Sequence, residues 1–139
     1  MAQCLKPLNI LYAEDCEDDF SMFIESVEES GLSLTIHRVN DGQKLVDYFS
    51  GEPSLPNLII SDLNMPGKNG FDAVREIRKK SLLVRIPIII FSNSTSMSDV
   101  QQSYDLGVNS FIQKPLSYQE HLKCVKTLLN YWFQIVQLP

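Results

Sequence analysis

Short apolar runs alternate along this chain with segments in which apolar residues recur at helical spacing. Five runs have the length and composition of strands: 8–13, 34–39, 58–61, 88–92 and 108–113. After the first run, Phe20, Phe23, Ile24 and Val27 stand at i, i+3, i+4 and i+7, which is typical of an amphipathic helix. The pattern predicts five strands that alternate with five helices.

Capping residues mark where several of these helices begin and end. Gly31 follows the first helix and is a suitable residue for its end. Ser96 with Asp99, and Ser117 with Glu120, have the spacing of capping boxes at the start of the last two helices. These pairs predict where the last two helices begin.

Some polar residues are interpreted as ordinary surface positions. In the third predicted helix, Phe71, Val74 and Ile77 share the inward face, which leaves three basic residues on the outward face: Arg75, Arg78 and Lys79. His37 and His121 are isolated on separate elements. Both histidines are expected at the surface, without a metal or phosphohistidine role.

Apolar strands separated by helices predict a parallel sheet that is covered on both faces. We expect an α/β protein with a flavodoxin-like, doubly wound (βα)5 fold and a five-stranded sheet in the order 2-1-3-4-5. The chain of 139 residues shows no repeat, low-complexity segment or linker, so residues 1–139 are expected to form a single domain.

Composition narrows the function classes. The net charge of −5 argues against general nucleic-acid binding, because no basic face is available for phosphates. No apolar run has the length of a signal peptide or a membrane span, so we expect a cytoplasmic protein with no membrane role. Cys4, Cys16 and Cys124 lack metal-ligand spacing and are interpreted as structural thiols in a reducing compartment.

Polar residues follow the predicted strands at the points where ligands bind in such sheets. Glu14 and Asp15 follow the first strand, Asp62 the third, Ser92 the fourth and Lys114 the fifth. Because the carboxyl ends of parallel strands meet at one edge, these side chains are expected to converge there.

Three converging carboxylates repel one another and call for a cation. Oxygen ligands without His or Cys suit a hard ion such as Mg²⁺ (or Mn²⁺). Asp62 is then a candidate nucleophile that forms an aspartyl phosphate, Lys114 a candidate partner for the phosphoryl charge, and Ser92 a candidate sensor of the phosphoryl group. The acidic loop 14–19 lacks the glycine-rich cradle of nucleotide-binding proteins, so a nucleotide cofactor is not expected.

These residues together resemble the signature of bacterial response-regulator receiver domains in two-component signalling. The resemblance rests on Glu14-Asp15, the loop 62–67 (Asp-Leu-Asn-Met-Pro-Gly), Ser92 and Lys114-Pro115. It implies Asp62 as phosphoacceptor, Asp15 as main metal ligand, Glu14 as a metal partner through water, and the backbone carbonyl of Asn64 as a further ligand. It also implies a phosphoryl contact for Lys114, Ser92 as switch hydroxyl, Phe111 as switch aromatic and a cis Lys114–Pro115 peptide.

Within that family the chain is similar to the single-domain regulators of bacterial and cyanobacterial phytochromes. The similarity lies in the start 12–15 (Tyr-Ala-Glu-Asp), the run 88–94 and the end 131–139. It implies a light-sensing histidine kinase as partner and a homodimer. The chain departs from the wider family at Glu14, where many members have Asp, and at Phe111, where chemotaxis-type regulators have Tyr.

Three assignments stay open between a functional and a plain structural role. The acidic run 17–19 is interpreted as helix-start charge rather than as metal ligands. Phe111 is equally compatible with a core aromatic. The last helix, expected over about 117–136, is apolar on most sides at its end; Tyr131, Trp132, Phe133 and Val136 either fold back over the domain or form a self-association or partner interface.

The expected function is a phosphorylation-activated switch rather than an enzyme in the usual sense. A histidine kinase phosphorylates Asp62, and with no output domain expected after the last helix, the signal passes to a downstream protein or by phosphorelay to another histidine. A haloacid-dehalogenase-type phosphatase would need an acid where Asn64 stands. A pseudo-receiver scaffold would lack an acid or the lysine, and this sequence has them all.

Overall fold

Five parallel strands form the centre of the protein in the computed structural model, which describes residues 8–51 and 53–139. The strands are β1 (Leu8–Ala13), β2 (Leu34–Val39), β3 (Leu58–Ser61), β4 (Ile88–Ser92) and β5 (Ser110–Gln113). They pair in the order β2-β1-β3-β4-β5, and every pair is parallel. The predicted doubly wound, flavodoxin-like sheet is confirmed.

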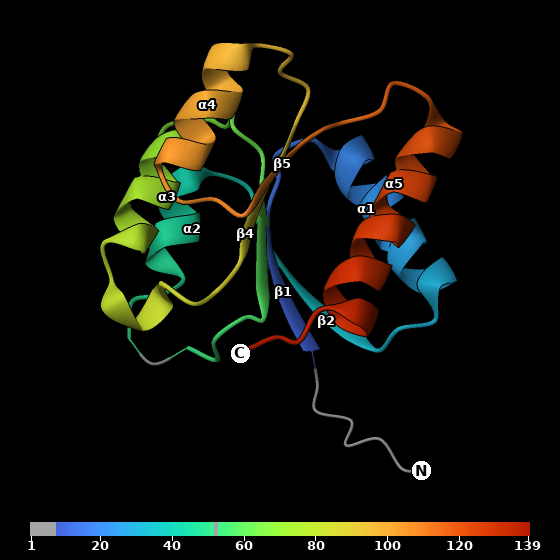
Figure 1. The fold of residues 1–139 in the computed structure, drawn as a ribbon, viewed down its shortest axis with the longest axis horizontal. Coiled ribbons are helices and arrows are strands. Elements are labelled where there is room, and N and C mark those ends of the chain that lie inside the picture. The colour runs from blue at the N-terminus through green and yellow to red at the C-terminus, as the bar shows by residue number, and fades with distance from the viewer. Residues whose placement is uncertain (1–7, 52) are drawn as a thin grey trace.

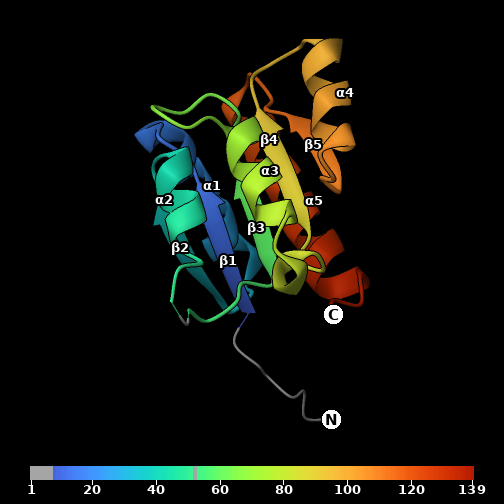
Figure 2. The same cartoon turned by 90° about the vertical axis from the view of Figure 1, so that its left-hand side faces the viewer.

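Helices cover both faces of the sheet (Figure 1). α1 (Glu17–Ser30) and α5 (Tyr118–Asn130) lie on one face, while α2 (Gly42–Asp47), α3 (Gly70–Arg78) and α4 (Met97–Asp105) lie on the other. Figure 2 shows the second group in front of the sheet. Among the described residues no helix is both long and apolar enough to cross a membrane.

Alternation along the strands builds one apolar core on each face. Leu11 and Ala13 point to the core shared with α2 and α3, whereas Ile10 and Tyr12 point to the core shared with α1 and α5. Burial of one such large side chain stabilises the fold by about 1.5–3 kcal/mol. The sheet is therefore a rigid support for the side chains that follow its strands.

The predicted caps are present, and the ends of two elements differ from expectation. The Ser96 and Ser117 side chains accept hydrogen bonds from the backbone N–H groups of Asp99 and Glu120. β5 begins at Ser110 rather than at residue 108, because Asn109 pairs with Ile88 through both its backbone and its side chain. The last α-helix ends at Asn130 and continues as a π-helical turn over Tyr131–Ile135, designated η2.

Arg78 does not lie on a solvated face, as the helical pattern had suggested. Its guanidinium donates hydrogen bonds to the backbone carbonyls of Gly107, Leu83 and Ile86 and to the Asn109 side chain. These carbonyls belong to the last residue of the short 3-10 helix η1 (Ser81–Leu83), to the segment before β4 and to the turn before β5. Arg78 therefore holds together the loops on both sides of β4.

His121 is also a correction, because it is only 2% exposed. It lies on the inward face of α5, where its ring packs against Phe91 with centroids 5.3 Å apart. Within residues 8–51 and 53–139 neither ring nitrogen has a hydrogen-bond partner, and burial lowers the pKa of the imidazole. His37 is exposed, as expected.

The interpretation of the cysteines as structural thiols holds only in part. Cys16 is exposed and therefore has no core-packing role, whereas Cys124 is half-buried on α5. Cys4 lies outside the described residues.

Candidate functional site

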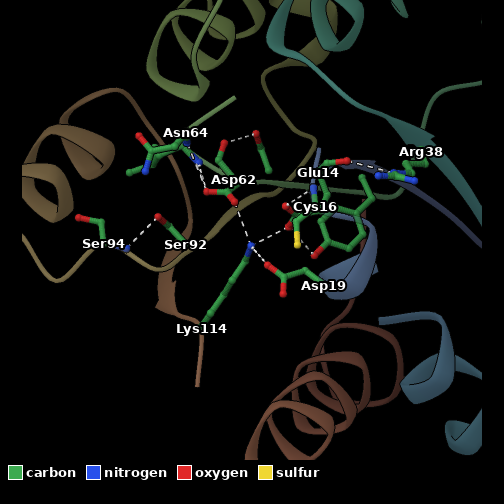
Figure 3. A network of polar contacts seen from close by, with 12 residues as sticks. Glu14, Cys16, Asp19, Arg38, Asp62, Asn64, Ser92, Ser94 and Lys114 are labelled. Carbon is green, nitrogen blue, oxygen red and sulfur yellow. Dashed lines mark hydrogen bonds and ion pairs between the residues drawn. The ribbon is translucent and has the colours of Figure 1, made fainter. Parts of the chain in front are cut away.

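Backbone hydrogen bonds extend the sheet past the strand ends and place three charged side chains side by side. The Glu14 N–H donates to the Val39 carbonyl at 2.9 Å, and the Asp62 N–H to the Ala13 carbonyl at 3.0 Å. The Lys114 N–H donates to the Ser92 carbonyl at 2.7 Å. Glu14, Asp62 and Lys114 therefore project from the same edge of the sheet (Figure 3).

The ammonium group of Lys114 is the centre of this edge. Its Nζ lies 2.7 Å from Glu14 Oε1, 2.6 Å from Asp19 Oδ2 and 2.9 Å from Asp62 Oδ2 (Figure 3). An ammonium has three N–H donors, so these contacts use all of them. Lys114 is 3% exposed. Burial alone would lower the pKa of this lysine, but its bonds to Asp19 and Glu14 raise it above the ordinary value.

Glu14 is fully buried, and burial raises its pKa to about 7 even though Lys114 opposes the shift. Its Oε1 accepts a hydrogen bond from the Tyr12 hydroxyl and its Oε2 from the Cys16 N–H, both at 3.3 Å. Its backbone carbonyl accepts from Arg38 Nε at 3.0 Å. These bonds orient Glu14 towards Lys114 and away from solvent.

The loop that follows Asp62 holds its carboxylate through backbone N–H groups. Its Oδ1 accepts from the N–H groups of Leu63 at 2.6 Å and Asn64 at 3.3 Å, which leaves Oδ2 for Lys114. The first residue of α3, Gly70, packs directly on this backbone: a Cβ there would lie 2.4 Å from the Asp62 carbonyl oxygen. A side chain at position 70 would displace Asp62.

The acidic cluster fits a divalent cation. One carboxylate oxygen from each of Glu14, Asp15 and Asp62 lies within 4.8 Å of the others, with Asp15 exposed and the other two buried. Carboxylate oxygens without a nitrogen or sulfur ligand suit Mg²⁺ or Mn²⁺. Asn64 is exposed two residues after Asp62, in the same loop.

The hydroxyl of Ser92 belongs to a different set of bonds. Ser92 is fully buried, and its Oγ accepts from the Ser94 N–H at 3.1 Å. Ser94 Oγ donates to Asp99 Oδ2 at 2.6 Å and accepts from the Ser96 N–H. Among the described residues, no hydrogen bond joins Ser92 to the carboxylates.

Phe111 is half-buried on β5 and packs against the core shared with α2 and α3. Its backbone N–H donates to the Tyr104 hydroxyl of α4 at 3.0 Å. Tyr104 is thus a link between α4 and the edge strand that sequence reasoning missed.

Asp19 was also missed, because the acidic run 17–19 was interpreted only as helix-start charge. Its carboxylate is an ion-pair partner of Lys114. A signal was available: Asp19 stands four residues before Phe23 and therefore on the inward stripe of α1, whereas Asp18 points outward and is exposed.

The expected cis peptide before Pro115 is wrong. The described residues contain no cis peptide bond, so Lys114–Pro115 is trans. Lys114 is directed into the site by its three carboxylate partners instead.

The apolar end of the chain divides into two groups. Trp132 and Phe133 pack back against the core shared with α1 and α5, and Val136 is half-buried. Tyr131 is 51% exposed and lines a groove of about 530 Å³ between β5 and α5, together with Trp132.

Comparison with known proteins gives a family and several relatives that are similar to this chain. The response regulator receiver domain family matches residues 10–126 of the chain. The probable methanogenesis regulatory protein FilR2 of Methanothrix harundinacea is 30% identical over 91% of this chain and 84% of its own length. Response regulator Rcp1 of Synechocystis sp. is 30% identical over 96% of this chain and 94% of its own length.

Solved structures of response regulators are also similar to this chain. The phosphorylated cyanobacterial phytochrome response regulator RcpA has a TM-score of 0.92 at 32% identity, over 96% of this chain and 99% of RcpA. The Mn²⁺-bound form of Rcp1 has a TM-score of 0.90 at 31% identity, over 96% of this chain and 99% of that one.

Proposed function

The chain belongs to the response regulator receiver domain family, and from that premise we propose that it is a switch turned on by phosphorylation of Asp62. A histidine kinase supplies the phosphoryl group. The observation that carries this proposal is the position of Lys114 Nζ, which contacts Asp62 Oδ2 at 2.9 Å inside a cluster of carboxylates.

The transfer is a displacement at phosphorus. Asp62 Oδ2 attacks the phosphorus of a phosphohistidine, the P–N bond breaks, and the imidazole nitrogen keeps the electron pair. The bonds from Leu63 and Asn64 to Oδ1 hold the carboxylate in one orientation for this attack. Lys114 then faces the charge on the phosphoryl oxygens.

Receiver domains bind a divalent metal at an acidic pocket, and the donor set here fits that group. We assign Glu14, Asp15, Asp62 and the backbone carbonyl of Asn64 as the residues that hold Mg²⁺ (or Mn²⁺). When bound, the cation neutralises charge on the phosphoryl oxygens. The Mn²⁺-bound form of the relative Rcp1 supports this assignment.

Ser92 and Phe111 are proposed as the responding pair. Ser92 Oγ leaves the Ser94 N–H and hydrogen-bonds the new phosphoryl oxygens, and the Phe111 ring turns into the space that it vacates. That movement changes the surface around α4 and β5, which partners then recognise.

The test is mass measurement after incubation with acetyl phosphate and Mg²⁺. Wild type is expected to gain one phosphoryl group, and Asp62→Asn none. Asp72→Asn, a surface carboxylate on α3, is the control and should behave as wild type. An adduct that persists in Asp62→Asn, or no adduct with Mg²⁺ present, contradicts the proposal.

For the partner, we propose a phytochrome-type histidine kinase. The support is the similarity to RcpA, a cyanobacterial phytochrome response regulator, and to Rcp1. Transfer to Asp62 from a phosphorylated phytochrome kinase should be at least 10-fold faster than from a kinase without a light-sensing domain. Equal rates would contradict the proposed pairing with a phytochrome-type kinase.

We also propose how the signal leaves the protein. Rcp1 and RcpA align with this chain over almost their entire lengths, which favours output by protein contact or phosphorelay over a linked DNA-binding domain. The exchange takes place in the cytoplasm, where such kinases present their phosphohistidine.

The apolar end of the chain is proposed as a homodimer interface. Tyr131 and Ile135 are exposed there, at 51% and 61%, next to the half-buried Trp132, Phe133 and Val136. Light scattering of Tyr131→Ser and of Trp132→Ser/Phe133→Ser should show monomers where wild type is a dimer. An unchanged mass in both phosphorylation states would contradict the interface.

A further inference from the structure

Lys114 has one partner outside the candidate metal cluster. Its contacts to Glu14 and Asp62 go to two of the three carboxylates that converge on the cation position. The third contact, to Asp19 at 2.6 Å, is the shortest and comes from the first turn of α1. Asp19 is not one of the converging carboxylates.

A divalent cation would share two carboxylates, Glu14 and Asp62, with the Lys114 ammonium. Glu14 Oε2 already accepts from the Cys16 N–H, and Asp62 Oδ1 accepts from Leu63 and Asn64. Glu14 Oε1 accepts from the Tyr12 hydroxyl and from Lys114, and Asp62 Oδ2 accepts from Lys114. A cation bound to these two carboxylates would draw on the negative charge that holds the ammonium and would weaken two of its three bonds.

The Asp19 carboxylate is placed by the core rather than by the loop. The next residue, Phe20, and Phe23 both pack against the Tyr12 ring on β1, with centroids 5.9 and 4.5 Å away. α1 in turn packs along α5. The Asp19 side chain is 18% exposed, so this anchor stays partly shielded from solvent.

We propose that Asp19 is a positioning residue that keeps the Lys114 ammonium at the site while the cation occupies Glu14 and Asp62. This inference rests on the proposed phosphorylation of Asp62. Without the Asp19 charge, the Lys114 ammonium has no fixed position once Glu14 and Asp62 bind the cation. The phosphoryl group then meets a lysine that has to be reoriented.

The first test compares phosphorylation rates by acetyl phosphate in excess Mg²⁺. Asp19→Asn keeps the size of the side chain and removes its charge, and it should slow adduct formation by about tenfold, less than the ~10²-fold that a 1 Å misplacement can cost. Asp19→Glu should recover most of the lost rate. Asp18→Asn, an exposed neighbour with the same charge change, should stay within about twofold of wild type.

The second test observes the Lys114 ammonium itself by ¹⁵N NMR during a titration with Mg²⁺ alone. In wild type and Asp18→Asn the Nζ signal should stay sharp as Mg²⁺ binds. In Asp19→Asn it should be sharp without Mg²⁺ and broaden on addition, because only then are the other two partners lost. A merely structural role for Asp19 would broaden the signal equally with and without Mg²⁺, and that result overturns the proposal.

The two proposals fail in different ways. If wild type is phosphorylated at Asp62 but Asp19→Asn matches Asp18→Asn in both tests, the positioning role is wrong and the switch chemistry stands. If wild type takes no phosphoryl group, the proposed function is wrong, and a Mg²⁺-dependent loss of the Lys114 signal in Asp19→Asn would still establish the anchor.

Discussion

The edge of the sheet that carries the site has two halves that are held together differently. The charged half joins residues that are distant in the sequence: Glu14, Asp19, Asp62 and Lys114. The side-chain hydrogen bonds of the hydroxyl half join residues within 92–99: Ser92, Ser94, Ser96 and Asp99. Figure 3 draws the charged half and the bond between Ser94 and Ser92, with no dashed line between the two; the Lys114 N–H reaches the Ser92 backbone carbonyl as part of the sheet.

In the proposed switch, this difference separates phosphorylation from the response to it. The charged half joins β1, β3, the start of α1 and the end of β5, so its carboxylates keep their positions as long as the sheet and α1 do. The hydroxyl half can break its bonds while the sheet stays intact. Removing one partner of a buried ion pair costs about 3–5 kcal/mol, whereas a neutral hydrogen bond contributes about 0.5–1.5 kcal/mol.

The largest expected effect comes from removing the centre of the charged half. Lys114→Met keeps the length of the stem and leaves two buried carboxylates without a counter-charge. The free energy of unfolding should fall by about 3 kcal/mol, measured by urea denaturation at neutral pH in the absence of divalent cations. Saturating Mg²⁺ should stabilise Lys114→Met more than wild type, because the cation no longer competes with an ammonium.

The control for Lys114 is a lysine in an ordinary ion pair. Lys68 pairs with Glu76 near the surface of α3, so Lys68→Met should cost less than about 1 kcal/mol. A loss in Lys114→Met as small as that in Lys68→Met would mean that the charged half is not a stabilised unit.

The fold was predictable from the sequence to a larger extent than the connections between side chains. The alternation of strands with helices and the caps at Ser96 and Ser117 follow from local patterns. The strand order follows from the fold class that this alternation favours, and the place of the residues after each strand follows from that topology. The carbonyls that Arg78 contacts could not be predicted, because a charged residue on a helix face shows nothing about the loops packed beside it. The inward stripe of α1 indicates the direction of the Asp19 side chain, but it does not show that the side chain meets the ammonium of Lys114 from the far end of the chain.

His121 was misplaced because a single polar residue gives no periodicity of its own. It lies on the stripe of Leu122, Val125 and Leu129, where the helix packs on the sheet. Packing of α5 therefore buried a titratable ring beside the charged half, and this leads to a pH effect of intermediate size.

His121 should make the protein less stable as pH falls below 6.5. Burial is the largest cause that lowers its folded-state pKa, the nearby charge of Lys114 also lowers it, and Asp19 opposes the shift. Below pH 6.5 the unfolded chain binds a proton that the folded chain resists, so unfolding free energy declines through that window. One group contributes at most about 1.4 kcal/mol per pH unit.

The measurement is urea denaturation from pH 5 to pH 8 for wild type and His121→Leu. Glu14, whose pKa is raised to about 7, contributes a slope of the opposite sign in both proteins, so the difference between them isolates His121. The stability of the variant relative to wild type should rise as pH falls below 6.5 and stay constant above it. His37→Gln reports what the exposed histidine on β2 contributes to the same curve. An unchanged slope in His121→Leu would mean that the buried ring titrates as it does in the unfolded chain.

The smallest effect is expected in the hydroxyl half, from Ser94→Ala. This change removes the bond to Asp99 and the acceptor for the Ser96 N–H, but it leaves every contact of Lys114 in place. The free energy of unfolding should fall by about 1 kcal/mol, and the rate of adduct formation at Asp62 should stay within about twofold of wild type. Ser98→Ala, an exposed serine in the first turn of the neighbouring helix α4, is the matched control. If Ser94→Ala instead slowed phosphorylation as strongly as Asp19→Asn, the two halves would be one network. The segment 92–99 would then take part in the phosphoryl transfer rather than only in the response to it.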